Sequence, residues 1–235
     1  MYDTDGNFLQ ALDTREMKTL LPEFMEVPFA SSGGNDTPRT VSRWKIVDLG
    51  CGTGRTTMTL LDQPHARIYG LDVSEQMLKV AKSKVEAAKS QNRCTFFAFD
   101  AMNAEECPKE LSGELQGGAD SVISALVIEH LPLETFFGVV KMVLKPHGTL
   151  LLTNMHSDMG AISQAGFVKE GIKIRPQSYI HTIPQVLEAA AKAGFKQVRE
   201  IREREVTGEM VNDLGVRAKK WVGVKVWFSV CFQRF

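Results

Sequence analysis

Residues 45–55 read KIVDLGCGTGR. An apolar run of strand character ends near an acid, Asp48, and a glycine-rich turn leads directly into a helical pattern. In doubly wound α/β domains, a strand, a turn and a helix of this kind form the corner that binds phosphate or nucleoside groups. Glycine is needed because the backbone must bend tightly and let a ligand approach where a Cβ would intrude. The stretch therefore predicts a ligand-binding α/β domain.

The spacing of the glycines favours one class of ligand. A dinucleotide fingerprint would place its third glycine at the position of Arg55, whereas this chain has Gly50, Gly52 and Gly54. With Asp48 ahead of it, this G-x-G-x-G resembles the first motif of the class I methyltransferases that use S-adenosylmethionine (SAM). The resemblance implies SAM as the cofactor. A nicotinamide dehydrogenase and a plain structural turn are the alternatives.

The composition bounds the remaining classes. With 235 residues, 43% of them hydrophobic and 24% charged, the chain predicts an ordinary globular protein with one large domain. Lys and Arg together number 28, as do Asp and Glu, and this balance argues against a nucleic-acid partner. The 4 cysteines are scattered, which is typical of a reducing compartment. We find no membrane-length apolar run and no signal peptide, so a cytoplasmic enzyme is expected, as a monomer or homodimer.

The hydrophobic pattern predicts alternating strands and helices, and hence a parallel sheet that is buried on both faces. After the first strand, strands are expected at 67–71, 94–99, 120–125 and 149–153, and helices at 55–61, 74–89, 132–144 and 184–193. Residues 196–205 and 224–232 alternate as two late strands, which suit the antiparallel edge hairpin in the seven-stranded sheet of the resembled family. The fold class is therefore α/β, a single Rossmann-like domain with helices on both faces.

The N-terminal part of the chain reads differently. Residues 7–26 have the apolar spacing of one or two amphipathic helices, and residues 31–40 form a polar, turn-rich linker. We expect residues 1–40 to form a helical lid and linker and residues 41–235 to form the methyltransferase domain. In the resembled family, such helices often close over the cofactor and substrate.

Acids end three of the first four strands, at Asp48, Asp72 and Asp100. Burying several carboxylates together is costly unless something pairs with them, so a hydroxyl-rich or cationic ligand is implied. Asp72 also follows Gly54 at roughly the 20-residue spacing of a ribose-binding acid. Any one of these acids alone would read as a turn residue at a strand end.

The resemblance assigns roles to these positions. Asp72 would accept hydrogen bonds from both ribose hydroxyls, Asp100 would accept one from the adenine amino group, and Asp48 would orient the methionine ammonium group. The remaining cofactor residues are expected along the adenine and at the end of the fourth strand: Val73, Met77, Ala101, Met102 and Ala125.

The residues after the fourth strand bear on the substrate. Enzymes that act on adenine or on glutamine side chains carry [DN]-P-P-[YF] there, whereas residues 124–127 read SALV. Residues 127–132, VIEHLP, resemble the x-x-E-H-x-P turn of quinone-type and other small-molecule methyltransferases. Carboxylates are missing where metal-dependent catechol-type enzymes place them, at the ends of the fourth and fifth strands. We therefore expect a small-molecule substrate and no metal ion.

Histidines supply the candidate bases, because a histidine near its ordinary pKa can accept a proton from a hydroxyl or N-hydroxyl group. His156 and His181 are expected to be catalytic, with loop and capping roles as the alternative. His130 is expected to line the substrate pocket, with a structural role at a helix start as its alternative. The other expected substrate contacts are Tyr2, Met155, Met159 and Tyr179. An apolar, aromatic-lined pocket of this kind fits a flat aromatic substrate.

The chain as a whole is similar to fungal small-molecule methyltransferases of secondary metabolism, in particular those acting on hydroxyl or N-hydroxyl groups of indole alkaloids in the roquefortine, meleagrin and oxaline series. The resemblance implies methyl transfer to oxygen, or else to nitrogen, of a small neutral aromatic alkaloid. Two alternatives stay open. One is a non-catalytic SAM-binding regulator, and the other is a protein methyltransferase.

Overall fold

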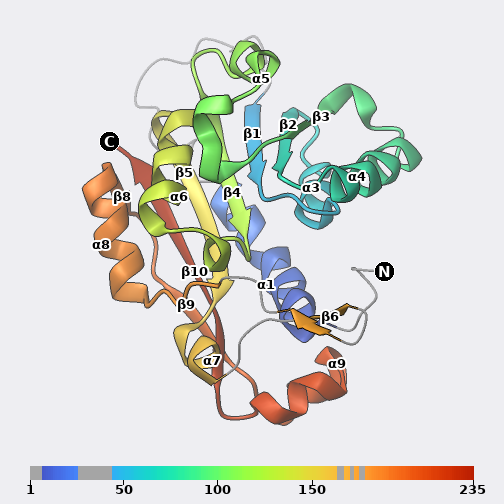
Figure 1. The fold of residues 1–235 in the computed structure, drawn as a ribbon, viewed down its shortest axis with the longest axis vertical. Helices are drawn as coiled ribbons and strands as arrows, with labels where there is room; N and C mark the ends of the chain where they lie inside the picture. The colour runs from blue at the N-terminus through green and yellow to red at the C-terminus, as the bar shows by residue number, and fades with distance from the viewer. Residues whose placement is uncertain (1–6, 26–43, 163–166, 170–171, 175–177) are drawn as a thin grey trace.

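One eight-stranded sheet forms the centre of the molecule (Figure 1). The computed structural model describes residues 7–25, 44–162, 167–169, 172–174 and 178–235. The strands of the sheet are β1 (Trp44–Leu49), β2 (Ala66–Asp72), β3 (Cys94–Ala98), β4 (Ala119–Ala125), β5 (Leu144–Met155), β8 (Phe195–Gln197), β9 (Arg202–Glu205) and β10 (Lys225–Arg234). Their spatial order is β3-β2-β1-β4-β5-β10-β8, and β9 also pairs with β10.

The first five strands are parallel, whereas β10 runs antiparallel to its neighbours β5, β8 and β9. The expected α/β class, with a mostly parallel sheet and an antiparallel edge, is therefore confirmed. The single strand expected at 196–205 is interrupted. Gln197 pairs with Phe232 and Arg202 pairs with Ser229, so the edge strand advances five positions while β10 advances three. The extra residues bulge out, and β8 and β9 are two pieces of one edge strand.

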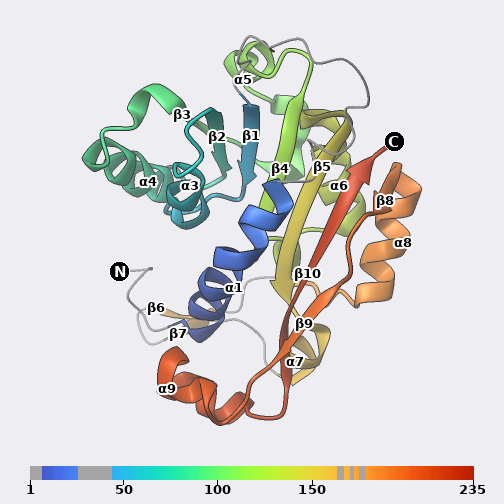
Figure 2. The same cartoon turned by 180° about the vertical axis from the view of Figure 1, so that it is seen from behind.

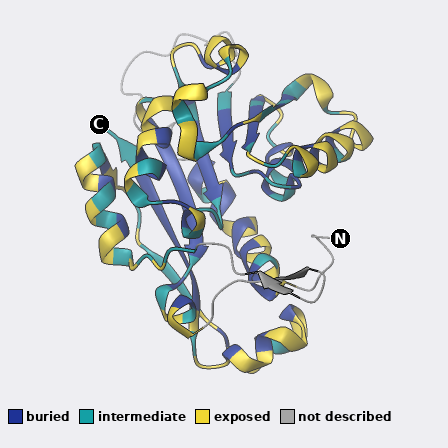
Figure 3. Cartoon of the chain, viewed as in Figure 1, coloured by how far each residue is buried: buried dark blue, intermediate teal, exposed yellow. Residues whose placement is uncertain are grey.

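Helices cover both faces of the sheet (Figures 1 and 2). One face carries α1 (Phe8–Met25), α3 (Arg55–Leu60) and α4 (Glu75–Ala87), and the other carries α5 (Lys109–Glu114), α6 (Leu133–Val143) and α8 (Ile183–Ala193). Each face has its own apolar core because successive strand residues point to opposite sides. In β1, Ile46 packs into the first core and Val47 into the second. Figure 3 shows the resulting buried sheet between helices whose outer surfaces are exposed.

Helix α1 packs on the first face, against β5 and β10. Its apolar residues at helical spacing include Leu9, Leu12 and Leu20, all buried in the first core, which is why this segment is helical as expected. The linker expected at 31–40 lies outside the described residues.

The late segments gather near the carboxyl ends of the parallel strands (Figure 1). These are α7 (Ser157–Ile162), α9 (Met210–Leu214) and a separate antiparallel pair, β6 (Phe167–Lys169) and β7 (Ile172–Ile174). The short helix expected between the last two strands is α9, and a 3-10 turn at Val216–Trp221 follows it. None of the helices in the described ranges is long and apolar enough to cross a bilayer.

Candidate active site

The turn between β1 and α3 is held in a conformation that favours glycine. Gly50, Gly52 and Gly54 have φ values of +74°, +52° and +82°. A Cβ on Gly50 would lie 2.3 Å from Cγ2 of Val127, and one on Gly54 would lie 3.0 Å from Cβ of Ala81. On Gly52 its nearest neighbour would be Sδ of Met77, at 3.7 Å. The outer two glycines therefore permit close packing, whereas the middle one leaves its space open.

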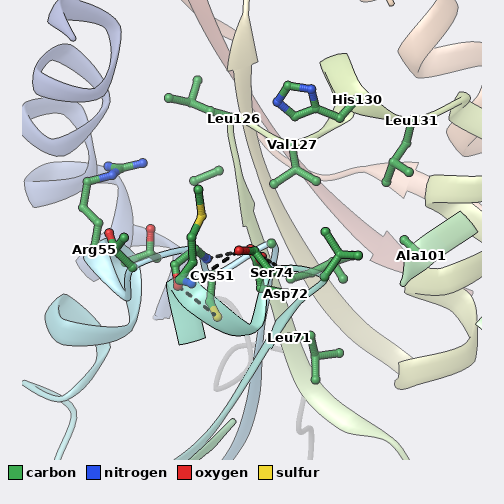
Figure 4. Close-up of a pocket in the computed structure, with 18 of the residues that line it drawn as sticks. Cys51, Arg55, Leu71, Asp72, Ser74, Ala101, Leu126, Val127, His130 and Leu131 are labelled. Carbon is green, nitrogen blue, oxygen red and sulfur yellow. Dashed lines mark hydrogen bonds between the residues drawn. The ribbon is translucent and has the colours of Figure 1, made fainter. Parts of the chain in front are cut away.

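That open space is part of a cavity of about 430 Å³ at the carboxyl ends of the strands. Figure 4 shows Leu126, Val127, His130 and Leu131 on the wall opposite Cys51, Asp72 and Ser74. The cavity is lined by these expected residues: Gly50, Gly52, Asp72, Val73, Met77, Asp100, Ala101, Met102, Ala125 and His130. Residues from β1, β2, β4 and the loops after them thus meet at the switch point of the sheet, where a ligand of such a fold binds.

Asp72 at the end of β2 is fixed by backbone donors. Its Oδ2 accepts a hydrogen bond from the Gly52 N–H at 2.8 Å, and its Oδ1 accepts one from the Ser74 N–H at 2.8 Å. An ionised carboxylate has about four acceptor sites, so each oxygen can take a further donor from the cavity. The geometry fits a ligand that presents two neighbouring hydroxyl groups.

Two apolar side chains of the cavity are unusually exposed. Val73 is 67% exposed and Met102 is 54% exposed, and both line the cavity. Between them in the chain, Asp100 accepts a hydrogen bond from the Met102 N–H at 2.9 Å and another from Nδ2 of Asn103 at 2.8 Å. Exposed apolar surface beside an acid suits a flat ring with a polar edge, such as adenine.

Asp48 lies beneath the glycine turn and not among the residues that line the cavity. It is buried, and its Oδ2 accepts a hydrogen bond from Oγ1 of Thr57 at 2.5 Å. Burial raises the pKa of Asp48 to about 6, against the opposing effect of the Thr57 hydroxyl. The carboxylate joins β1 to α3, and its expected role in orienting the methionine ammonium group, directly or through water, stays a prediction. Gly54 also lies outside the lining.

Helix α1 contributes residues that the sequence did not single out. Asn7, Leu9 and Gln10 line the cavity. One turn further on, Asp13 is fully buried, and its Oδ1 accepts hydrogen bonds from Oγ1 of Thr153 at 2.6 Å and from Nε1 of Trp227 at 2.8 Å. Asp13 could have been singled out in the sequence, because it is an acid within the apolar stripe of an amphipathic helix.

Glu129 is a second group that sequence reasoning passed over, although the motif containing it was noted. It lines the cavity in the turn after β4. Burial, aided by the negative charge of Asp13, raises the pKa of Glu129 to about 7. Its neighbour His130 also lines the cavity, and burial lowers the pKa of this imidazole. Burial therefore favours the neutral form of both side chains.

His156 was expected to be catalytic, and the structure places its imidazole among partners from its own chain. This side chain is buried, its Nε2 lies 2.9 Å from Oε1 of Glu203, and its Nδ1 accepts a hydrogen bond from the Asp158 N–H at 3.1 Å. Strand β5 extends to Met155, so His156 falls at the start of α7, against β9 and β10. The residue does not line the cavity.

The ring of His181 also has hydrogen-bond partners within the chain. Its Nε2 donates to the carbonyls of Ile128 and Leu131 at 3.1 and 2.9 Å, and its ring stacks on Tyr179 at 5.7 Å between centroids. His181 and Tyr179 line a separate surface groove between α6 and α8. The imidazole therefore supports the turn after β4 from behind and does not face the cavity.

Met155 and Met159, two further expected substrate residues, also lie outside the cavity lining. Met155 and Met159 pack against the first apolar core, and Tyr2 lies outside the described residues. Within the described ranges, no group of three or more His, Cys, Asp or Glu side chains is arranged to hold a metal ion. Metal independence stays a prediction.

The fold and the cavity define a class. A doubly wound sheet with β10 inserted antiparallel beside β5, a glycine turn after β1 and an acid after β2 are the features of the class I SAM-dependent methyltransferases. Residues 46–148 match the family model described as a methyltransferase domain. The chain is also 47% identical to an uncharacterized methyltransferase of Emericella nidulans over 248 residues, which cover 98% of this chain and 86% of that relative. The chain belongs to the methyltransferase family.

Two further similarities are informative. An O-methyltransferase of Penicillium expansum is 29% identical over 117 residues, 48% of this chain and 38% of that protein. The structure of a Haemonchus contortus phosphoethanolamine N-methyltransferase, solved with phosphomonomethylethanolamine and S-adenosylhomocysteine, superposes with a TM-score of 0.60 at 19% identity and covers 90% of this chain and 51% of that chain. This likeness shows the shared fold. SAM is the cofactor of the family.

Proposed function

We propose that this chain transfers the methyl group of SAM to a hydroxyl, N-hydroxyl or nitrogen of a small, largely neutral aromatic metabolite, without a metal ion. The observation that carries the proposal is the cavity wall opposite Asp72, where Leu126, Val127 and Leu131 present apolar surface interrupted by Glu129 and His130. Such a wall suits a flat apolar molecule with one or two polar groups. A net charge of zero agrees with a neutral substrate.

Similarity to one fungal relative supports part of the finer proposal, the acceptor atom. The Penicillium relative is an O-methyltransferase by name, which favours oxygen over nitrogen as the acceptor atom. We therefore favour O-methylation of an alkaloid of secondary metabolism.

Different residues of the cavity would bind the cofactor and align the substrate. SAM supplies a methyl group that is already activated by its sulfonium charge. Asp72 would hold the ribose hydroxyls, and Val73, Asp100 and Met102 would hold the adenine, as their placement around the cavity allows. The chain then mainly has to align the acceptor atom and exclude water, which the apolar wall does.

A proton must leave the acceptor if it is a hydroxyl group near neutral pH. His130 is an expected substrate residue that lines the cavity. Because burial lowers its pKa, His130 is neutral at neutral pH and can contact an acceptor.

The test is methyl transfer to matched acceptors. The full chain would be incubated with isotope-labelled SAM and, separately, a hydroxyindole, an N-hydroxyindole and an unsubstituted indole, with product masses as the readout. We expect transfer to one of the oxygen acceptors at the greatest rate. Binding of S-adenosylhomocysteine without transfer to any of the three would contradict the proposal and favour a regulator. Labelling of proteins in a cell extract instead would favour a protein methyltransferase.

A further inference from the structure

The carboxylate of Glu129 is a buried group with an unused oxygen. Its Oε2 is shielded from solvent and accepts no hydrogen bond from any described residue. A buried acceptor without a hydrogen-bond donor is energetically unfavourable. Glu129 also lines the cavity, so this residue borders the space that a bound molecule would occupy.

The side chain of Asn154 is a polar neighbour of Glu129, and its hydrogen bond opposes the rise in the pKa of this carboxyl. Asn154, at the end of β5, is 2% exposed, and its Oδ1 is also buried without a partner among the described residues. Asp13 of α1 adds a second carboxylate nearby, but it is already paired with Arg55 at 2.6 Å between Nη2 and Oδ2. The other titratable or charged groups that line the cavity are His130 in the same turn, Asp72 on the opposite wall, and Cys51, Arg55 and Asp100.

The turn that carries Glu129 is held from outside the cavity. The Tyr179 N–H donates to the carbonyl oxygen of Glu129 at 2.7 Å, and Nε2 of His181 donates to the carbonyl of Ile128 at 3.1 Å. The backbone of residues 128–131 is therefore fixed independently of any ligand. The backbone that carries this carboxylate is therefore preorganised.

We propose that Glu129 is the residue that binds the hydrogen of the acceptor group and takes its proton during methyl transfer. This inference rests on the proposed function and adds the base. In the step, the oxygen or nitrogen of the acceptor forms a bond to the methyl carbon while the carbon–sulfur bond breaks and its electron pair stays on sulfur. The proton of the acceptor passes to Oε2 of Glu129. The positive charge of the sulfonium and the negative charge of the carboxylate are both neutralised.

The assignment narrows the substrate class. The methylated atom must carry a hydrogen, as in a phenol, an N-hydroxyl group or an amine, because the carboxylate offers only acceptor sites when it is ionised. A carboxylate acceptor is disfavoured, since it carries no hydrogen for Glu129 to bind when it is ionised and would add a negative charge beside this carboxylate.

The test needs no knowledge of the substrate. Sinefungin carries an ammonium-bearing carbon where SAM carries its methyl sulfonium, so its amine probes the place of the transferred methyl group. S-adenosylhomocysteine lacks that amine. Calorimetry would give the dissociation constant of each compound for the wild type, for Glu129→Gln and for a matched control, Glu134→Gln. Glu134 is an exposed carboxyl in the first turn of α6 and lies outside the cavity lining.

We expect the wild type to prefer sinefungin over S-adenosylhomocysteine, and Glu129→Gln to lower this preference about tenfold at pH 8, which corresponds to roughly 1.4 kcal/mol. Glu134→Gln should behave as the wild type. In the wild type the preference should fall as the pH drops from 8 to 6, because Glu129 becomes protonated, and Glu129→Gln should show a flat profile. His130→Gln, measured in the same way, should retain the fall, which separates Glu129 from the titration of the imidazole.

An unchanged preference in Glu129→Gln would overturn the inference. If Glu129→Gln fails to fold, the inference is still tested by the pH dependence of the sinefungin preference in the wild type and in His130→Gln. A preference that does not vary with pH would contradict a titrating carboxylate at this place. The ratio of the two constants is independent of which metabolite is methylated. A failure of the acceptor panel and a failure of this inference are therefore distinguishable.

Discussion

The carboxylate of Asp13 in helix α1 lies 2.6 Å from the guanidinium of Arg55 in the first turn of α3. Asp13 is fully buried, and Arg55 lines the cavity. The same carboxylate accepts hydrogen bonds from Thr153 and Trp227, which belong to β5 and β10. One acid therefore joins the N-terminal helix to the glycine turn and to the sheet, so the α1 wall of the cavity is set by the same contacts that hold the fold.

Replacing Asp13 is expected to destabilise the protein strongly. Asp13→Ala leaves a hydroxyl, an indole N–H and a guanidinium without their partner, and breaking such a buried pair costs about 3–5 kcal/mol. The matched control on the same helix is Arg15→Ala, which removes an exposed ion pair to Asp213 at 3.5 Å and should cost no more than about 1 kcal/mol. Urea unfolding measures both. Equal losses in the two variants would contradict a special role for Asp13.

The glycine turn predicts a graded response to alanine. Gly50→Ala combines a positive φ with a Cβ placed 2.3 Å from Val127, so we expect a loss of more than about 3 kcal/mol in unfolding free energy. Gly52→Ala has only ordinary contact distances and should lose about 1 kcal/mol, yet weaken SAM binding because its Cβ occupies ligand space. Gly117→Ala is the control, with φ of +82° and no atom within 4 Å of the added carbon. Similar stabilities for the Gly50 and Gly117 variants would contradict the packing account.

Asp72→Ala is expected to weaken binding of S-adenosylhomocysteine about 30- to 100-fold, because two charge-assisted hydrogen bonds to the ribose would be lost. Isothermal titration calorimetry measures the dissociation constant. The control is Asp62→Ala, which removes an exposed carboxylate of the turn after α3 and should leave affinity unchanged. Unaltered affinity in Asp72→Ala would remove the assignment of the ribose site.

The raised pKa of Asp48 leads us to expect an unusual dependence of stability on pH. Its pKa is raised from 3.8 to about 6, so the folded state holds this proton more tightly than the unfolded state does. The stabilising contribution is present below about pH 4 and is lost as the pH rises through about 6, by up to about 3 kcal/mol. Asp48→Asn should therefore gain stability relative to the wild type between pH 4 and pH 8. Parallel urea titrations at the two pH values measure it, and a constant difference would argue against the raised pKa.

His156→Gln is expected to lower stability and to spare methyl transfer. The wild-type imidazole joins α7 to β9 through Glu203, and this contact is outside the cavity lining. We expect a lower melting temperature, unchanged affinity for S-adenosylhomocysteine and a turnover rate close to that of the wild type at 20 °C or below, on the acceptor that the indole panel identifies. A large loss of turnover with retained folding would restore the catalytic role that the sequence suggested.

The local parts of the site could be predicted from the sequence. The glycine turn and the acid after β2 are signals within a short stretch, because backbone bending and strand ends leave their mark on neighbouring residues. The order of strands and helices followed for the same reason, and the interruption of the edge strand did not, since a bulge depends on pairing with β10.

Which side chains share the cavity was decided by the tertiary structure. Asp13 and Thr153 are hydrogen-bonded across 140 positions, and His156 meets Glu203 across the sheet edge. A histidine after a strand looks the same in the sequence whether it faces a ligand or a neighbouring strand. The sequence alone determined the elements and their ligand-binding turn, because these depend on the conformational preferences of adjacent residues. The burial that gives Glu129 its raised pKa required the packing of three distant segments, and only long-range contacts determine that.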